Sequence, residues 1–219
     1  AKKVRRARLR LEKDFAAKEP GEPDSDLAQN LKRYIRESEA VAAIAAVGLP
    51  RTAARFMNLP FYRTGGVRKR PIGEEDVELV LDMLKNVRPY QIFVAGDLSD
   101  PHGTHRMCKQ AIDEALLRYR GAAPKVWLYR GAWQEWSITE ADVLVPLSQE
   151  ELRNKIFAIF KHQSQKDVAP LPGGYDDREF WQRVRSRNLD TAAAADRLGL
   201  PEYYAMEAYR VENETGTPN

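Results

Sequence analysis

The chain has 219 residues, of which 43% are hydrophobic and 31% charged, and its formal net charge is +3. This length allows one domain with an appendage, and the composition excludes disordered and collagen-like chains. No apolar run approaches the roughly 18–20 residues that a membrane helix needs. The single cysteine, Cys108, excludes an internal disulfide and a zinc site built from cysteines. We therefore expect a cytoplasmic protein with no membrane partner.

The basic charge lies in one terminal run. Residues 1–13 hold seven basic side chains and one acidic one, a net charge of +6, whereas the rest of the chain holds 28 basic and 31 acidic residues. A face that binds nucleic acid requires a basic stripe with stacking aromatic residues, so we expect no nucleic-acid partner. We interpret residues 1–26 as a solvated basic helix and linker, 27–212 as the core and 213–219 as a frayed tail.

The core alternates between amphipathic helices and short apolar strands. Helices are predicted over 27–47, 74–87, 104–119, 148–162 and 177–198, and strands over 53–59, 91–95, 125–129, 142–145 and 203–211. Ser148 and Glu151 form a capping box, and Thr104 is a candidate N-cap. The alternation predicts an α/β fold with a mostly parallel sheet flanked by helices.

Two of the three histidines lie in the segment that leaves strand 91–95 and enters the next helix. His102 and His105 are three residues apart, and Asp97 and Asp100 flank them. Ligands of open α/β sheets bind at this position. Imidazoles at this spacing suit two metal ligands, or one ligand and one acid–base group. The alternative is a pair of polar loop histidines that cap carbonyl groups.

Other chemistry-bearing residues admit two interpretations each. His162 lies near a predicted helix end, where a histidine can simply cap carbonyl groups. Trp133 and Trp136 suit either stacking on a sugar ring or packing in the core. The sequence contains no GxSxG, P-loop, GxGxxG or CxxC motif, so the corresponding hydrolase, nucleotide and redox functions lack their motifs.

Four segments, in chain order, resemble those of a known family. They are Arg36-x-x-Glu39-x-x-x-Ala43 with Val47-Gly48, Phe56-Met57-Asn58-Leu59-Pro60, Asp100-Pro101-His102-Gly103-Thr104-His105, and Lys155-x-x-Ala158-Ile159-x-x-His162-x-Ser164-Gln165. The pattern is similar to the PIG-L/LmbE-type deacetylases, zinc hydrolases that remove acetyl groups from substrates containing N-acetylglucosamine. It most resembles a subgroup found in the C-terminal half of proteins named glucosamine-6-phosphate deaminase or isomerase. Asn58 departs from the pattern, because aspartate is more usual there.

The resemblance implies roles for particular residues. His105 is expected to be a zinc ligand, and His102 a general acid or a stabiliser of the tetrahedral intermediate. Asp100 is grouped with His102 as a catalytic candidate. Asp97 and His162 are expected to contact and orient the residues that bind the metal and the substrate. Both aspartates carry carboxylates that can also ligate zinc. Arg36 is expected to face the amino-sugar substrate.

One departure from the family is larger than the others. The family's His-Pro-Asp-Asp element supplies two zinc ligands and the aspartate general base, and this sequence contains no His-Pro dipeptide. No strand is predicted before the first helix, and the chain starts at Ala1. We therefore expect the C-terminal part of a Rossmann-like deacetylase domain that lacks its first strand or strands.

Three functions follow from this expectation. The first is a fragment of a zinc-dependent N-deacetylase that binds zinc weakly and deacetylates nothing as given. The others are a part of a deaminase/isomerase-type protein, and a non-catalytic domain that kept the fold. Because the loss of a strand exposes unpaired backbone groups, we also expect a homo-oligomer, self-association through the open sheet edge, or a strand supplied by another molecule.

Overall fold

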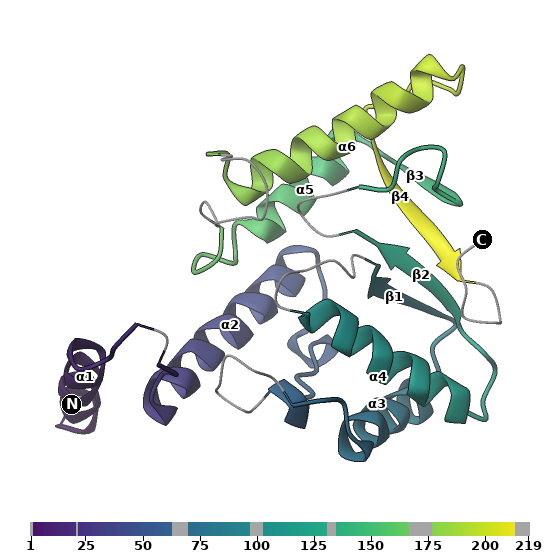
Figure 1. The fold of residues 1–219 in the computed structure, drawn as a ribbon. Helices are drawn as coiled ribbons and strands as arrows, with labels where there is room; N and C mark the ends of the chain where they lie inside the picture. Colours follow the sequence, from purple (N-terminus) through teal and green to yellow (C-terminus); the bar gives the residue numbers. More distant parts are fainter. Residues whose placement is uncertain are drawn as a thin grey trace.

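The computed structural model describes residues 2–20, 22–62, 70–96, 103–130, 135–166 and 177–212. Its helices are α1 (Lys2–Ala16), α2 (Asp26–Ala46), α3 (Glu74–Val87), α4 (Thr104–Arg118), α5 (Gln149–Ile159) and α6 (Phe180–Arg197). Two short 3-10 helices are η1 (Arg51–Ala53) and η2 (Pro60–Tyr62). The strands are β1 (Gln91–Ala95), β2 (Lys125–Tyr129), β3 (Val143–Leu147) and β4 (Ala205–Glu212) (Figure 1).

The sheet is mixed, in the order β1-β2-β4-β3. β1 and β2 are parallel, whereas β4 is antiparallel to both β2 and β3. The α/β class is confirmed, but the prediction of a mostly parallel sheet is wrong for the described strands. No described helix separates β2 from β3 in sequence, and β4, the last of the described strands, lies between them in the sheet. Helix–strand alternation does not encode this insertion, because it depends on pairing between distant segments.

The strand expected at 53–59 is not formed. Arg51–Ala53 is a 3-10 turn, and Asn58 has φ +51°, which interrupts an extended chain. Met57 and Leu59 instead pack against the apolar cluster between α3 and α4. The apolar residues of this segment therefore pack against helices, although the segment itself forms no strand.

Both α4 and α6 pack against one face of the sheet. Val94, Val126 and Leu128 form a buried cluster with Ala208, and Ile112 and Leu116 of α4 pack on it. Ala192 and Ala195 of α6 pack against Met206, which lies on the same side of β4 as Ala208. Phe93, Trp127 and Tyr209 alternate with these residues, so their rings lie on the opposite face of the sheet.

Trp136 belongs to the core, so the sugar-stacking interpretation is wrong for this residue. Its side chain is 7% exposed, and its Nε1–H donates to the carbonyl oxygen of Leu128 at 2.9 Å. A Cβ on Gly96 would lie 2.9 Å from the Trp136 ring and 2.8 Å from the Leu128 Cβ, so the close packing requires glycine there. Trp133 lies outside the described residues.

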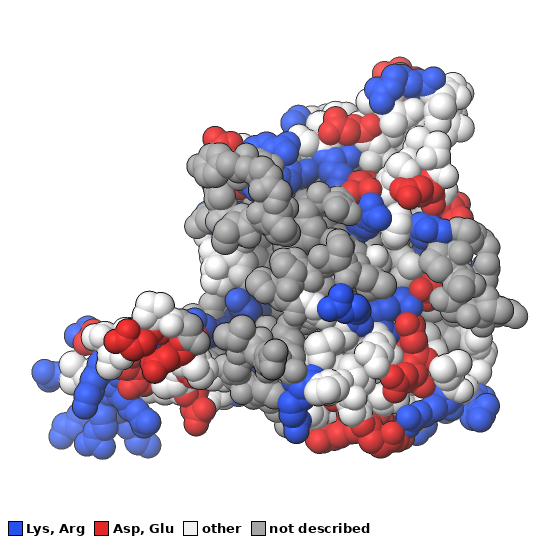
Figure 2. Space-filling view, in the orientation of Figure 1, with Lys and Arg blue, Asp and Glu red and all other residues white. Residues whose placement is uncertain are grey.

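The N-terminal helix stands apart from the rest of the molecule (Figure 1). α1 has no buried residue, and Figure 2 shows its basic side chains gathered at one end of the molecule. The Ser25 hydroxyl donates to Asp14 at 2.6 Å, which ties the end of α1 to the start of α2. In the described part of the chain, no helix combines the length and hydropathy needed to cross a bilayer.

Candidate functional site

The α2 helix presents one stripe of residues along its contact with α5. Arg36, Glu39, Ala43 and Val47 are spaced by three or four positions, which places them on one face of the helix. α2 packs against α5, and Ala43 is buried near that contact. Arg36 is exposed one turn before Glu39. The small side chain of Ala43 lets the two helices approach closely.

Glu39 connects the stripe on α2 to the segment that follows α5. Its carboxylate accepts hydrogen bonds from the backbone N–H and the hydroxyl of Ser164, each at 2.7 Å. Ser164 is two residues beyond His162, which is half-buried in the turn after α5. The first and fourth segments of the predicted motif, 125 residues apart at this contact, therefore meet through two hydrogen bonds.

A groove of about 420 Å³ lies between α2 and α5. Ala43, Val47, Ala158 and Ile159 supply apolar walls, and the polar lining comes from Glu151, Asn154, Lys155 and His162. An apolar groove with a few polar groups is the usual form of a small-molecule site. The predicted site residue His162 lines this groove, and Arg36 lies on the same face of α2 as Ala43 and Val47.

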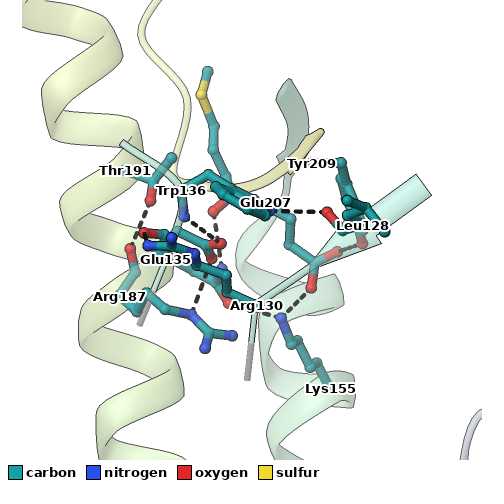
Figure 3. A network of polar contacts seen from close by, with 11 residues as sticks. Leu128, Arg130, Glu135, Trp136, Lys155, Arg187, Thr191, Glu207 and Tyr209 are labelled. Carbon is teal, nitrogen blue, oxygen red and sulfur yellow. Dashed lines mark hydrogen bonds and ion pairs between the residues drawn. The ribbon is translucent and has the colours of Figure 1, made fainter. Parts of the chain in front are cut away.

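Lys155 also belongs to a polar network behind the groove (Figure 3). Its ammonium group binds the Glu207 carboxylate and donates to Oδ1 of Asn188 at 2.9 Å. Asn188 is fully buried, and its amide donates to the carbonyl oxygen of Met206 at 2.9 Å. The Tyr209 hydroxyl donates to the other oxygen of Glu207. These contacts hold Lys155 in one position between α5, α6 and β4.

Burial sets the electrostatics of this network. Burial lowers the pKa of Lys155, although the attraction of the Glu207 carboxylate acts to raise it. Burial also acts to raise the pKa of Glu207, but Lys155, the Tyr209 hydroxyl and Arg187 together outweigh it and keep that pKa below its ordinary value. Burial and the bond to Glu207 raise the pKa of Tyr209, so its hydroxyl stays protonated as a donor. Perturbed groups beside a groove mark it as a candidate site.

Glu135 is a second half-buried carboxylate in the network, and it forms an ion pair with Nε of Arg187 at 3.0 Å. Burial raises its pKa above the ordinary 4.5 and outweighs the attraction of Arg187. The folded protein therefore binds this proton more tightly than the unfolded chain does. The bound proton therefore contributes to the free energy of unfolding. This contribution is fully present at pH values below the ordinary pKa of the carboxyl group, and it is lost as the pH rises through the raised pKa.

We expect the wild-type protein to lose stability relative to Glu135→Gln as the pH rises from the ordinary pKa of 4.5 towards neutrality. Urea denaturation of both proteins across this range measures the difference in the free energy of unfolding. The attraction of Arg187 for the ionised carboxylate opposes this loss, but burial outweighs it in the net direction of the pKa shift. Glu150→Gln, at an exposed position of α5, is the control. A difference between wild type and Glu135→Gln that stays constant with pH contradicts the assignment.

His105 is the second residue of α4, the helix that follows β1. The predicted Thr104 N-cap is wrong: Gly103 is the N-cap, with φ +64°, a conformation that glycine adopts without strain. Nδ1 of His105 is buried and has no hydrogen-bond partner among the described residues. Asp97, Asp100 and His102 lie outside those residues, so the structure does not describe their position relative to His105.

The zinc site implied by the resemblance can be tested against the donor groups present. The described residues contain no group of three or more His, Cys, Asp or Glu side chains that could hold a metal ion. Catalytic zinc normally takes three protein ligands. The described part of the chain therefore does not fit a zinc centre by itself. The ligand role of His105 stays a prediction.

Sequence reasoning missed several members of the polar network. Lys155 was part of the late motif but had no assigned role, and its separation of 52 residues from Glu207 gives no local signal. Glu135 lies outside the helices and strands, and its partner Arg187 lies on α6, 52 residues further along the chain. Only their pairing in space distinguishes these charges from ordinary surface residues.

Comparisons with known proteins bear on the longer protein and on the fold. No model of a protein family matches the chain. A protein of Bacteroides thetaiotaomicron named glucosamine-6-phosphate deaminase-like is 46% identical over 205 residues. The match covers 91% of this chain but only 31% of that relative, so the chain spans less than a third of the relative's length.

A solved structure shares the fold. The crystal structure of GalB, the 4-carboxy-2-hydroxymuconate hydratase of Pseudomonas putida, matches with a TM-score of 0.60. The match covers 97% of this chain and 82% of the hydratase chain, at 17% sequence identity. At this identity the similarity concerns the fold alone. The arrangement of helices around the open mixed sheet is therefore one that an enzyme chain also uses.

Proposed function

We propose that these residues form the substrate-binding part of a PIG-L/LmbE-type amino-sugar deacetylase with a Rossmann-like fold, within a longer protein. The observation that carries the proposal is the pair of hydrogen bonds from Ser164 to Glu39, which joins two segments of the family pattern beside one groove. The name of the 46% identical relative supports an amino-sugar phosphate as the substrate class.

The groove between α2 and α5 supplies a binding role without a metal. Arg36 is exposed on the same face of α2, about two helical turns before Ala43, and we propose that its guanidinium group binds a phosphate or carbonyl oxygen of a substrate that extends beyond the groove. His162 and Lys155 are two of the hydrogen-bonding groups in the mostly apolar lining. Glu207 and Asn188 hold the Lys155 ammonium, which limits its movement when a ligand binds. His102, Asp100 and Asp97, which precede α4 in the sequence and lie outside the described residues, keep their proposed roles.

The relative's name favours a second candidate function. In this alternative the chain is a non-deacetylating part of a deaminase/isomerase-type protein, and another part of the longer chain performs the named reaction. The two candidates differ in product: deacetylation of N-acetylglucosamine substrates releases acetate and leaves the amine on the sugar, whereas deamination of glucosamine-6-phosphate releases ammonia. Assays for acetate and ammonia with the longer protein distinguish them.

Binding measurements test the role of the groove directly. We expect glucosamine-6-phosphate to bind the 219-residue protein, and Arg36→Ala to weaken that binding by roughly 10–100-fold, because a hydrogen bond to a charged group contributes about 1.5–3 kcal/mol. Isothermal titration calorimetry measures the two dissociation constants. Arg33→Ala is a matched control on the same helix, because its guanidinium lies over the Tyr34 ring at 5.0 Å. Equal weakening by both variants contradicts a specific role for Arg36.

A further inference from the structure

A second cavity, of about 630 Å³, lies where α3 and α4 end and the chain enters β1 and β2. Its walls are mostly apolar, and four basic side chains line it: Lys85, Arg88, Arg118 and Arg120. Among the described residues, no acidic side chain lines this cavity, and none of its lining residues belongs to the groove between α2 and α5. Figure 2 shows basic side chains at the lower right, where α3 and α4 end in Figure 1.

Two of these four positive charges are neutralised within the protein. Lys85 pairs with Asp82 at 3.2 Å, and Arg118 pairs with two glutamates of α3. Basic residues in the last turn of a helix also interact favourably with its dipole, which accounts for both positions. The side chains of Arg88 and Arg120 lie beyond the helical turns and have no ion-pair partner in the described part of the chain. Two guanidinium groups at the cavity therefore remain available to an anion.

The backbone of Arg88 is strained. Arg88 follows α3 with φ +49° and ψ +57°, in the left-handed region, and its N–H donates to the Leu84 carbonyl oxygen at 2.8 Å. Glycine is the usual residue at such a helix end, because it adopts this conformation without a Cβ clash. The backbone cap needs no side chain, so an arginine here keeps a charge at the cavity at the cost of strain. Strained residues of this kind concentrate at ligand sites.

Two tyrosines give the cavity an aromatic surface. Tyr90 is 74% exposed, although its backbone is fixed by a hydrogen bond of 2.9 Å from the Lys125 N–H to its carbonyl oxygen. Tyr119 is half-buried, and a Cβ on Gly121 would clash with its hydroxyl group, so the ring lies close against the backbone that leads to β2. Exposed aromatic rings on a fixed backbone are surfaces on which nucleobases stack. The cavity therefore combines available positive charge with an aromatic surface.

We propose that this cavity binds a nucleoside phosphate. Arg88 and Arg120 bind the phosphate oxygens through charge-assisted hydrogen bonds, and the base stacks on the exposed ring of Tyr90. The volume of the cavity lies within the range of roughly 300–1,000 Å³ that small-molecule sites occupy. A free phosphate or a sugar phosphate uses the positive charges but not the aromatic surface. The site is separate from the groove of the proposed function, and it needs no residue of that groove.

Calorimetric titration with adenosine monophosphate, adenosine and inorganic phosphate tests the proposed ligand class. We expect the 219-residue protein to bind adenosine monophosphate more tightly than either of its parts at low ionic strength. Tyr90→Ala is expected to weaken binding of adenosine monophosphate by roughly tenfold and to leave phosphate binding unchanged, because it removes the stacking surface alone. Tyr90→Phe keeps the ring and is expected to bind like the wild type.

The arginines are tested with a control of matched charge. Arg88→Gly and Arg120→Ala are each expected to weaken binding of adenosine monophosphate by roughly tenfold or more, because each removes hydrogen bonds to a charged group. Glycine adopts the left-handed backbone without strain, so Arg88→Gly is expected to keep the melting temperature of the wild type. Arg197→Ala, which removes an exposed arginine from the last turn of α6, is expected to leave binding unchanged.

The proposal is overturned if adenosine monophosphate does not bind, or if Arg197→Ala weakens its binding as much as Arg88→Gly does. Equal affinities for adenosine monophosphate and inorganic phosphate overturn the nucleoside part of the assignment. Arg36→Ala is expected to leave this binding unchanged. Loss of binding in Arg36→Ala places the nucleotide beside the groove between α2 and α5 and also overturns the proposal.

Discussion

The 219-residue protein is expected to deacetylate no N-acetylglucosamine substrate, even with added zinc. The sequence lacks the His-Pro-Asp-Asp element that supplies two zinc ligands and the general base in the family it resembles. Loss of general-base assistance alone typically lowers the rate by about 10²–10⁴-fold. With the described residues providing no three-ligand group, the loss of the metal site is expected to add to this effect. An assay that labels the newly formed sugar amine with a fluorescent reagent measures the rate.

The control is the full-length protein, assayed with the same substrates. Deacetylation by the full-length protein and none by the 219-residue protein is the expected pair of results. Calorimetric titration with zinc is expected to show weak binding to the shorter protein, with His105→Ala reducing it further. Robust turnover by the 219-residue protein contradicts the mapping of the family motif. Inactivity of both proteins, together with ammonia release by the longer one, favours the deaminase-type alternative.

Trp136→Ala is expected to destabilise the protein by about 3–5 kcal/mol, the usual cost of truncating a buried aromatic residue. Trp136 packs with Val94, Val126, Leu128 and Ala208 in the cluster that joins β1, β2 and β4. The variant leaves a cavity beside Gly96 and removes the hydrogen bond to the Leu128 carbonyl. The Arg130 guanidinium, 4.0 Å from the ring centroid, also loses its aromatic contact. Urea denaturation monitored by far-UV circular dichroism measures the change.

Trp136→Phe separates packing from hydrogen bonding. The smaller ring keeps most of the apolar contact but lacks the N–H, so a loss of about 1–2 kcal/mol is expected. Trp181→Ala supplies a comparison: this tryptophan is half-buried and its N–H donates to Glu179 two residues away. If Trp136→Ala costs no more than Trp181→Ala, Trp136 does not carry the central packing that the structure assigns to it.

Local sequence signals predicted most elements because their causes are local. Ser148 and Glu151 form the predicted capping box, with the Ser148 hydroxyl accepting from the Glu151 N–H and the Glu151 carboxylate accepting from the Ser148 N–H. The acidic first turn and apolar stripe of Glu74–Val87 correctly predicted α3. The error at 53–59 arose because Met57 and Leu59 have the apolar character of a strand, but they pack against α3 and α4 rather than pair with a neighbour.

The candidate site was predictable only in part. The late motif identified His162 and Ser164, and the first motif identified Arg36 and Glu39, because each motif is contiguous in sequence. Neither motif predicts that the two segments are in contact in the folded protein. Glu207 on β4 and Asn188 on α6 were not predicted at all. Each acquires its role through its contact with Lys155, which lies on a different element, α5.

The sequence by itself determined the α/β class, the helix boundaries to within a few residues and the contiguous motifs on α2 and after α5, because periodicity and capping act over one or two turns. Only the tertiary structure decided that β4 inserts antiparallel between β2 and β3, and that Glu39 binds Ser164. It alone also placed Lys155 against Glu207. These features depend on contacts between residues far apart in the chain, which burial and backbone pairing select together and no local pattern encodes.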